Sequence, residues 1–140
     1  MECFLCQKHA GKVSQPPGGY IYKDSHWLIC HAPGDKGPLG SLFLESQRHF
    51  LDFADILPEE AESYGLLLKK IYSELRKLTG AERIYQLIIL EGVPHFHAWL
   101  IPRMREFPER GMDFLQKDYY CSEPEIQKLV TALREAMRRS

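Results

Sequence analysis

Long hydrophobic runs are missing from this 140-residue sequence. A membrane-spanning helix needs about 18 or more consecutive apolar residues, and the longest apolar stretches here are far shorter. The first eight residues, 1–8, also lack the apolar region of a secretory signal peptide. These absences argue against a membrane partner and make the cytoplasm the expected location.

A strong charge imbalance is also missing, because the formal net charge is only -1. No whole-protein field therefore favours nucleic acid or an anionic membrane, and we expect neither as a partner. There are only four cysteines, and in a reducing compartment they are more readily thiols or metal ligands than disulfides. We find no repeat, low-complexity segment or linker, so residues 1–140 are expected to form a single domain.

The pattern of apolar residues predicts an α+β fold. Short β-rich segments occur at 20–22, 27–30, 41–44 and 83–90, and a fifth runs from Val93 toward Pro102. The fourth and fifth segments are separated by Gly92, which suggests a tight turn between antiparallel strands. The expected fold is therefore a mainly antiparallel five-stranded sheet, to which the helices described next are added.

Two helices are predicted by their apolar stripes and end signals. The longer falls within 55–79, with Pro58 suited to its first turn and Gly80 to its stop. Its stripe is formed by residues at spacings of three and four, namely Tyr64, Leu67, Leu68, Ile71, Leu75 and Leu78. A capping box at 122–125 begins the C-terminal helix. The charged segment 103–118 is expected to be a surface loop.

The most informative segment is 93–103, which reads VPHFHAWLIPR. In a strand, His95, His97 and Trp99 would point to one face and the intervening apolar residues to the other. Imidazoles at this spacing can share a metal or a phosphate, and histidine suits nucleophilic or acid–base work near neutral pH. The strand is expected to stop at Pro102, and Arg103 follows as an anion contact or a surface ion pair.

This segment resembles the signature of the histidine triad family of nucleotide hydrolases and transferases. The family pattern is His, apolar, His, apolar, His and two apolar residues, often followed by Pro-Arg, and residues 95–103 fit it except that Trp99 replaces the third His. The resemblance implies that His97 is the catalytic residue, which attacks an α-phosphate and forms a nucleotidyl-histidine intermediate. It also implies the α+β fold expected above. A structural histidine is the alternative for His97.

The N-terminal pair Cys3-x-x-Cys6 can occupy two corners of a zinc tetrahedron. The alternatives are two unremarkable thiols or a redox pair, and His9 is a rival third ligand. Many bacterial histidine triad proteins begin with this motif and bind zinc. Their other two ligands correspond here to His49 and His95. The resemblance thus implies a structural zinc ion with four protein ligands.

Other positions depart from the family pattern and indicate a remodelled pocket. Trp99 can donate one hydrogen bond but cannot shuttle a proton, so we expect it to shape the substrate pocket. Arg103 is a candidate phosphate contact. His31 follows the second strand, where a family binding residue would lie, and is also a candidate substrate contact. His26, which precedes the same strand, could also reach the pocket, but an exposed loop position explains it equally well.

The expected activity is therefore hydrolysis or nucleotidyl transfer at the α-phosphate of a nucleotide conjugate. The alternative is a zinc-stabilised module that binds a nucleotide or another phosphorylated small molecule without turnover. Family members often pair into homodimers, an arrangement that this sequence neither demands nor excludes.

Overall fold

The computed structural model of the chain describes residues 3–139 and contains one five-stranded sheet. The strands are β1 (Tyr22–Lys23), β2 (Trp27–His31), β3 (Leu42–Ser46), β4 (Arg83–Leu87) and β5 (His97–Arg103). Their order in the sheet is β1-β2-β3-β5-β4, and every neighbouring pair is antiparallel. The expected fold class, α+β with a mainly antiparallel five-stranded sheet, is confirmed.

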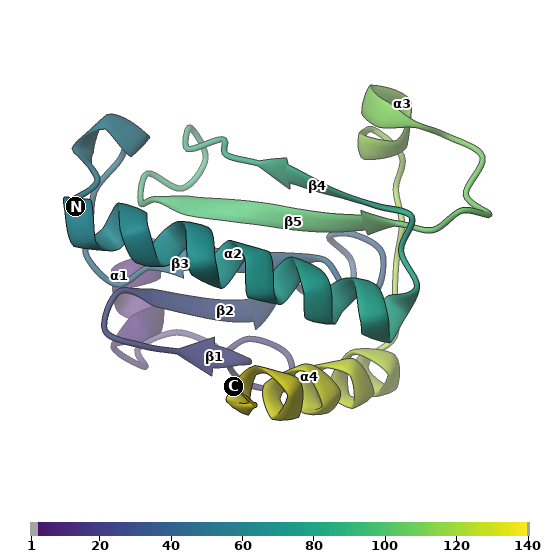
Figure 1. Cartoon of the computed structure of the whole chain (residues 1–140), viewed down its shortest axis with the longest axis horizontal. Coiled ribbons are helices and arrows are strands. Elements are labelled where there is room, and N and C mark those ends of the chain that lie inside the picture. The colour runs from purple at the N-terminus through teal and green to yellow at the C-terminus, as the bar shows by residue number, and fades with distance from the viewer. Residues whose placement is uncertain (1–2, 140) are drawn as a thin grey trace.

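Two long helices cover one face of this sheet, and a short helix lies on the other (Figure 1). The covering helices are α2 (Pro58–Thr79) and α4 (Glu123–Arg138), and the short one is α1 (Phe4–His9). A further short helix, α3 (Gly111–Leu115), follows β5, and a single 3-10 turn, η1 (Phe53–Asp55), precedes α2. None of the helices in the described range 3–139 is long and apolar enough to cross a membrane.

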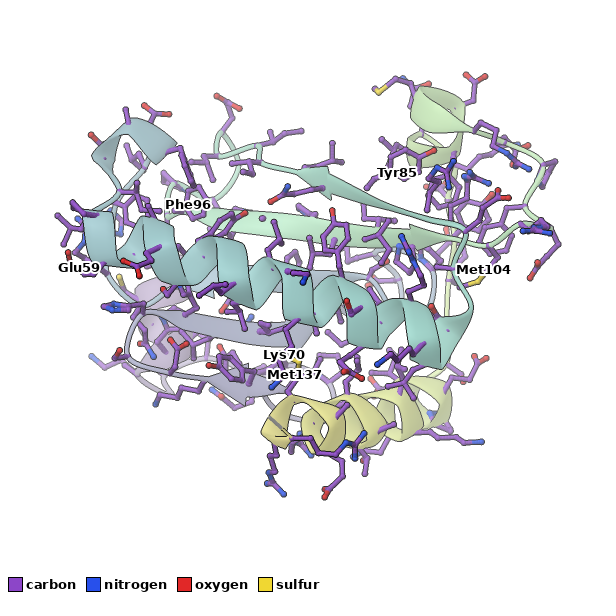
Figure 2. All side chains as sticks on the ribbon, viewed as in Figure 1. Glu59, Lys70, Tyr85, Phe96, Met104 and Met137 are labelled. Atoms are coloured by element: carbon purple, nitrogen blue, oxygen red, sulfur yellow. The ribbon has the colours of Figure 1, made fainter. Side chains whose placement is uncertain are left out.

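The core lies between the sheet and the two long helices. Phe96, Ala98 and Leu100 are fully buried in it, as the alternation along β5 predicts. Phe96 lies directly before β5, behind the first turns of α2 (Figure 2). Lys70 of α2 donates to the carbonyl of Met137 at 2.9 Å, so a cation also satisfies an acceptor at the end of α4.

The helix signals in the sequence are largely confirmed. Pro58 begins α2, Gly80 caps it in the left-handed conformation with φ of 74°, and the Ser122–Glu125 capping box begins α4. Tyr64, Leu67, Ile71 and Leu75 are buried as predicted, and the apolar stripe of α4 is buried as well. Leu78 was placed in the stripe wrongly, because it is 44% exposed in the last turn of α2.

The predicted ends of two strands are wrong. β4 stops at Leu87, and Ile88 and Ile89 are exposed in a loop that replaces the expected tight turn at Gly92. β5 does not stop before Pro102 but continues through it. β3 begins at Leu42, opposite Leu100, so the proline has a partner strand on one side only and its missing N–H is tolerated there.

Two short helices were not predicted. The segment 103–118, expected to be a loop, contains α3, which is fixed by the fully buried Phe114 stacked on Tyr85 with ring centroids 5.6 Å apart. The other is α1, which has six residues. Helices this short have no independent stability in water, so their formation depends on tertiary contacts that a local pattern does not reveal.

Two leucines of α2 allow a matched test of the core. We expect Leu75→Ala, at a fully buried position, to lower the free energy of unfolding by about 2–5 kcal/mol. Leu66→Ala, at a position that is 71% exposed on the same helix, should change it by no more than about 0.5 kcal/mol. Urea denaturation measures both. Equal losses in the two variants would contradict the placement of the core.

Candidate functional site

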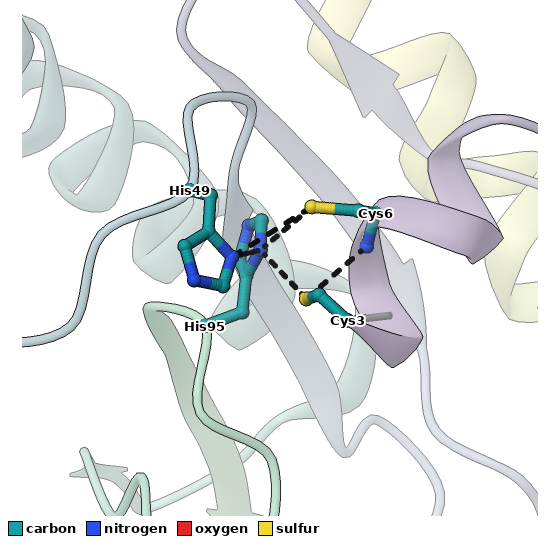
Figure 3. A group of neighbouring side chains, drawn as sticks. All are labelled: Cys3, Cys6, His49 and His95. Carbon is teal, nitrogen blue, oxygen red and sulfur yellow. Dashed lines mark hydrogen bonds between the residues drawn. The ribbon is translucent and has the colours of Figure 1, made fainter. Parts of the chain in front are cut away.

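The four residues expected to bind zinc lie together on the face of the sheet opposite α2 and α4. Cys3 caps the N-terminus of α1 and accepts from the Cys6 backbone N–H at 3.4 Å, so both sulfurs face the same side. His49 lies in the loop after β3, and His95 lies two residues before β5 (Figure 3). Three separate segments of the chain thus meet at one point.

The distances between the ligand atoms fit a tetrahedral metal ion. His95 Nδ1 is 3.3 Å from Cys3 Sγ and 3.6 Å from Cys6 Sγ, and His49 Nδ1 is 3.7 Å from Cys6 Sγ and 3.2 Å from His95 Nδ1. All four donor atoms lie within 4.8 Å of one another. Zinc bonds of about 2.0–2.3 Å at tetrahedral angles separate neighbouring ligand atoms by about 3.3–3.8 Å. The donor set therefore fits zinc.

The protonation state of His95 also fits metal binding. Its Nε2–H donates to the Ser46 carbonyl at 2.7 Å, which leaves the Nδ1 lone pair for the cluster. Burial lowers the pKa of His95 from its ordinary value and so favours the neutral ring that metals require. The rival ligand His9 lies outside the cluster, with its Nε2 2.9 Å from Glu45 Oε1.

An ion pair fixes the loop that carries His49. Arg48 donates to both carboxylate oxygens of Glu60 on α2, at 3.0 and 2.8 Å, and to the Asp55 carbonyl at 2.8 Å. The Arg48 guanidinium holds the pKa of Glu60 below its ordinary value, so the carboxylate remains charged near neutrality. This pairing joins the start of α2 to the metal cluster.

His97 lies beside the cluster and lines a cavity of about 350 Å³, which we call the His97 cavity. Its Nδ1 is 2.8 Å from the His95 carbonyl oxygen. A carbonyl accepts only from a protonated nitrogen, so Nδ1 carries a hydrogen, and in the neutral ring the lone pair is then on Nε2. The side chain is buried yet lines the cavity.

Trp99 is on the same face of β5 as His97 and lines the same cavity, as strand alternation predicts. Its ring packs edge-on against Phe43, with centroids 4.3 Å apart. Both aromatic rings also line a second cavity of about 450 Å³, which we call the His31 cavity. The tryptophan therefore stands where the two cavities meet.

His31 and Arg103 have different surroundings from those expected of substrate contacts. Both ring nitrogens of His31 bond to the backbone, with Nδ1 2.6 Å from the Ala32 carbonyl and Nε2 accepting from the Gly40 N–H at 2.9 Å. His31 lines the His31 cavity, but both of its ring nitrogens are already bonded to the backbone. Arg103 is six residues beyond His97, about 20 Å along the strand, and pairs with Glu82 at 2.8 Å. The structure does not bring it to His97.

A buried polar network beneath α1 was not predicted from the sequence. Lys8 Nζ donates to Glu45 Oε2 at 2.7 Å and to Cys30 Sγ at 3.2 Å, while Glu45 Oε1 also bonds to His9 and, at 3.3 Å, to the Tyr20 hydroxyl. Burial alone would raise the pKa of Glu45, but the bonds from His9 and Lys8 hold it below its ordinary value. A glutamate directly after the apolar run 42–44 was the one available signal.

Comparisons with known proteins agree on the fold. No protein-family model matches the chain, and no curated protein matches it in sequence. Among solved structures, a Hit-like protein from Bartonella henselae, crystallised with an unknown ligand, has a TM-score of 0.74 at 15% identity, with 96% of each chain covered. A histidine triad nucleotide-binding protein from Sulfolobus tokodaii has a TM-score of 0.75 at 14% identity, covering 97% of this chain and 92% of its own.

A third similar structure carries zinc. It is a Zn-bound histidine triad family protein from Mycobacterium smegmatis, with a TM-score of 0.69 at 23% identity over 99% of this chain and 94% of its own. This chain has the histidine triad fold. The fold expected from the motif at 95–103 is thereby confirmed, while the roles of the individual site residues remain predictions.

The metal cluster generates a direct test. We expect freshly purified protein to carry about one zinc ion per chain. Cys3→Ser protein should lose the ion and melt at a lower temperature, because a bound ion stabilises the folded state only while its site is complete. Cys121→Ser is the matched control, since the Cys121 thiol contacts the Gly37 carbonyl far from the cluster. Elemental analysis and thermal unfolding give the two readouts.

Two results would contradict the zinc assignment. One is metal-free native protein isolated without chelator. The other is Cys3→Ser protein that holds as much zinc as the native chain does.

Proposed function

We propose that this chain is a histidine triad-type nucleotide hydrolase or nucleotidyl transferase in which His97 is the nucleophile. The observation that carries the proposal is the bond from His97 Nδ1–H to the His95 carbonyl, which presents an unprotonated Nε2 to a cavity. The Sulfolobus tokodaii protein of the same fold is described as nucleotide-binding, which supports a nucleotide ligand.

The proposed reaction has two displacements at the α-phosphorus. In the first, the Nε2 lone pair forms a bond to phosphorus and the bond from phosphorus to the leaving group breaks. The Nδ1–H bond to the carbonyl stabilises the positive charge that develops on the ring. In the second, the oxygen of a water or of an acceptor hydroxyl attacks phosphorus and gives its proton to solvent or to the departed leaving group, the phosphorus–nitrogen bond breaks, and His97 regains its lone pair.

The zinc site has a structural role in this proposal. Cys3, Cys6, His49 and His95 would hold the ion with four protein ligands and no open position for water. A bound ion there supplies folding free energy. The residues themselves fix the start of α1 and the chain that leads into β5, and thereby the position of His97.

A binding module without turnover is the second candidate, and Trp99 favours it. The indole N–H can donate a hydrogen bond but cannot pass a proton to a leaving group. A site with a nucleophile and no proton donor would hold a phosphorylated ligand and release it unchanged. The next two experiments distinguish these candidates.

A covalent adduct tests the role of His97. We expect native protein, incubated with an adenylated or guanylated substrate and quenched, to gain the mass of one nucleotidyl group on His97, as seen by peptide mass spectrometry. His97→Ala should show no adduct. His26→Ala is the control and should form it normally, because His26 lies in the turn before β2 and lines neither cavity. An adduct-free native protein that still binds nucleotide would instead support the binding module.

Restoring the third histidine tests the role of Trp99. We expect Trp99→His to raise the hydrolysis rate of a nucleoside phosphoramidate, since a positioned acid–base group contributes about 10²–10⁴-fold. Trp99→Phe, which keeps an aromatic ring and adds no titrating group, should show no such gain. No increase in Trp99→His protein that still binds nucleotide would show that the pocket serves another substrate.

The homodimer also remains a prediction. β4 is an edge strand of the sheet and is followed by the exposed Ile88 and Ile89. An unpaired strand edge next to exposed apolar side chains is a surface on which a second copy can pair.

A further inference from the structure

Lys8 places a buried ammonium at the meeting point of the two cavities. Its side chain lines both the His97 cavity and the His31 cavity, although the residue is only 7% exposed. An ammonium has three N–H donors. Within the described range 3–139, one donates to Glu45 and one to Cys30, so one donor remains for a ligand.

Glu45 supports this ammonium and also lines the His97 cavity, but its oxygens are already occupied. Its two oxygens already bond to Lys8, His9 and Tyr20, and the Cys30 thiol lies 3.6 Å from Oε2. The carboxylate therefore fixes the position of Nζ and balances its charge. The polar group that the network offers to the cavities is a hydrogen-bond donor.

The sheet register determines which part of a ligand meets this donor. Glu45 pairs with His97 across β3 and β5, whereas Cys30 pairs with Phe43 across β2 and β3. Lys8 bridges Glu45 and Cys30, so it lies toward β2, on the side away from His97. A nucleotide whose phosphorus faces His97 would extend past Lys8 into the His31 cavity, between Phe43, Trp99 and the 14–17 loop.

We propose that Lys8 is a specificity-determining residue that donates a hydrogen bond to an oxygen of the base and selects 6-oxo purines over adenine. This inference rests on the proposed nucleotide function. Guanine and hypoxanthine present an acceptor oxygen at position 6, where adenine presents an amino donor. Lysine has no acceptor, so an amino group there meets a donor and leaves both groups unpaired.

The test compares three ligands on the native protein and two variants. The ligands are guanosine, inosine and adenosine 5′-monophosphates, and isothermal titration calorimetry measures their affinities. Inosine monophosphate lacks the 2-amino group and so isolates position 6. We expect native protein to bind both 6-oxo nucleotides about 10- to 100-fold more tightly than adenosine monophosphate, the range of one charge-assisted hydrogen bond.

The variants separate the cationic donor from the ion pair as a whole. Lys8→Arg keeps a cationic donor beside Glu45 and should retain the preference. The double variant Lys8→Met with Glu45→Gln removes both charges together, so no buried charge is left unpaired, and the glutamine oxygen can still accept from His9 and Tyr20. The preference should be lost in this double variant. Zinc content serves as the check that α1 is still in place.

Each other outcome overturns the proposal. A double variant that binds all three nucleotides more weakly by the same factor would mean that Lys8 contacts phosphate. An unchanged ratio would mean that it contacts no part of the base. Equal binding of the three nucleotides by native protein refutes the proposal even if the variants do not fold, and leaves the proposed function standing. Native protein that binds none of them refutes the proposed function as well.

Discussion

The register of β3 against β5 is the constraint on which the site depends. It sets Glu45 opposite His97 and Phe43 opposite Trp99 on one face of the sheet, while Leu44 and Ala98 pair on the face that forms the core. A slip of one residue would turn each of these side chains to the other face, so burial of the core and assembly of the site are a single event. The same register positions the chain before β5, where His95 turns toward the metal cluster.

The helix α1 is held at both ends by residues that the register brings within reach. Its first turn is fixed by the cysteines beside His49 and His95, and its last turn by Lys8 and His9 against Glu45. A six-residue helix contributes little stability of its own, so these contacts decide whether it forms a wall of the cavities. The cysteine–histidine cluster and the His97 cavity thus both depend on the position of α1.

Much of the fold could be predicted from local sequence patterns, because α2 and α4 have clear apolar stripes and caps and the strands have strong β-formers. The four residues expected to bind zinc came from a motif and a resemblance, and the structure brings them together. The Lys8–Glu45 pair could not be predicted, since the two residues are 37 positions apart and nothing local marks a lysine that will be buried. Arg103 was expected near the phosphate because it follows the motif. Strand geometry instead carries it to the far end of β5, where Glu82 pairs with it.

A crystal structure of the zinc-loaded protein with guanosine 5′-monophosphate tests the central claim, that His97 faces the phosphorus of a bound nucleotide, most directly. We expect the phosphorus about 3–3.5 Å from His97 Nε2, with Nδ1 still bonded to the His95 carbonyl and the base beside Lys8. A nucleotide whose phosphate lies away from His97, at the His31 end of the cavities or on another face of the protein, would contradict it.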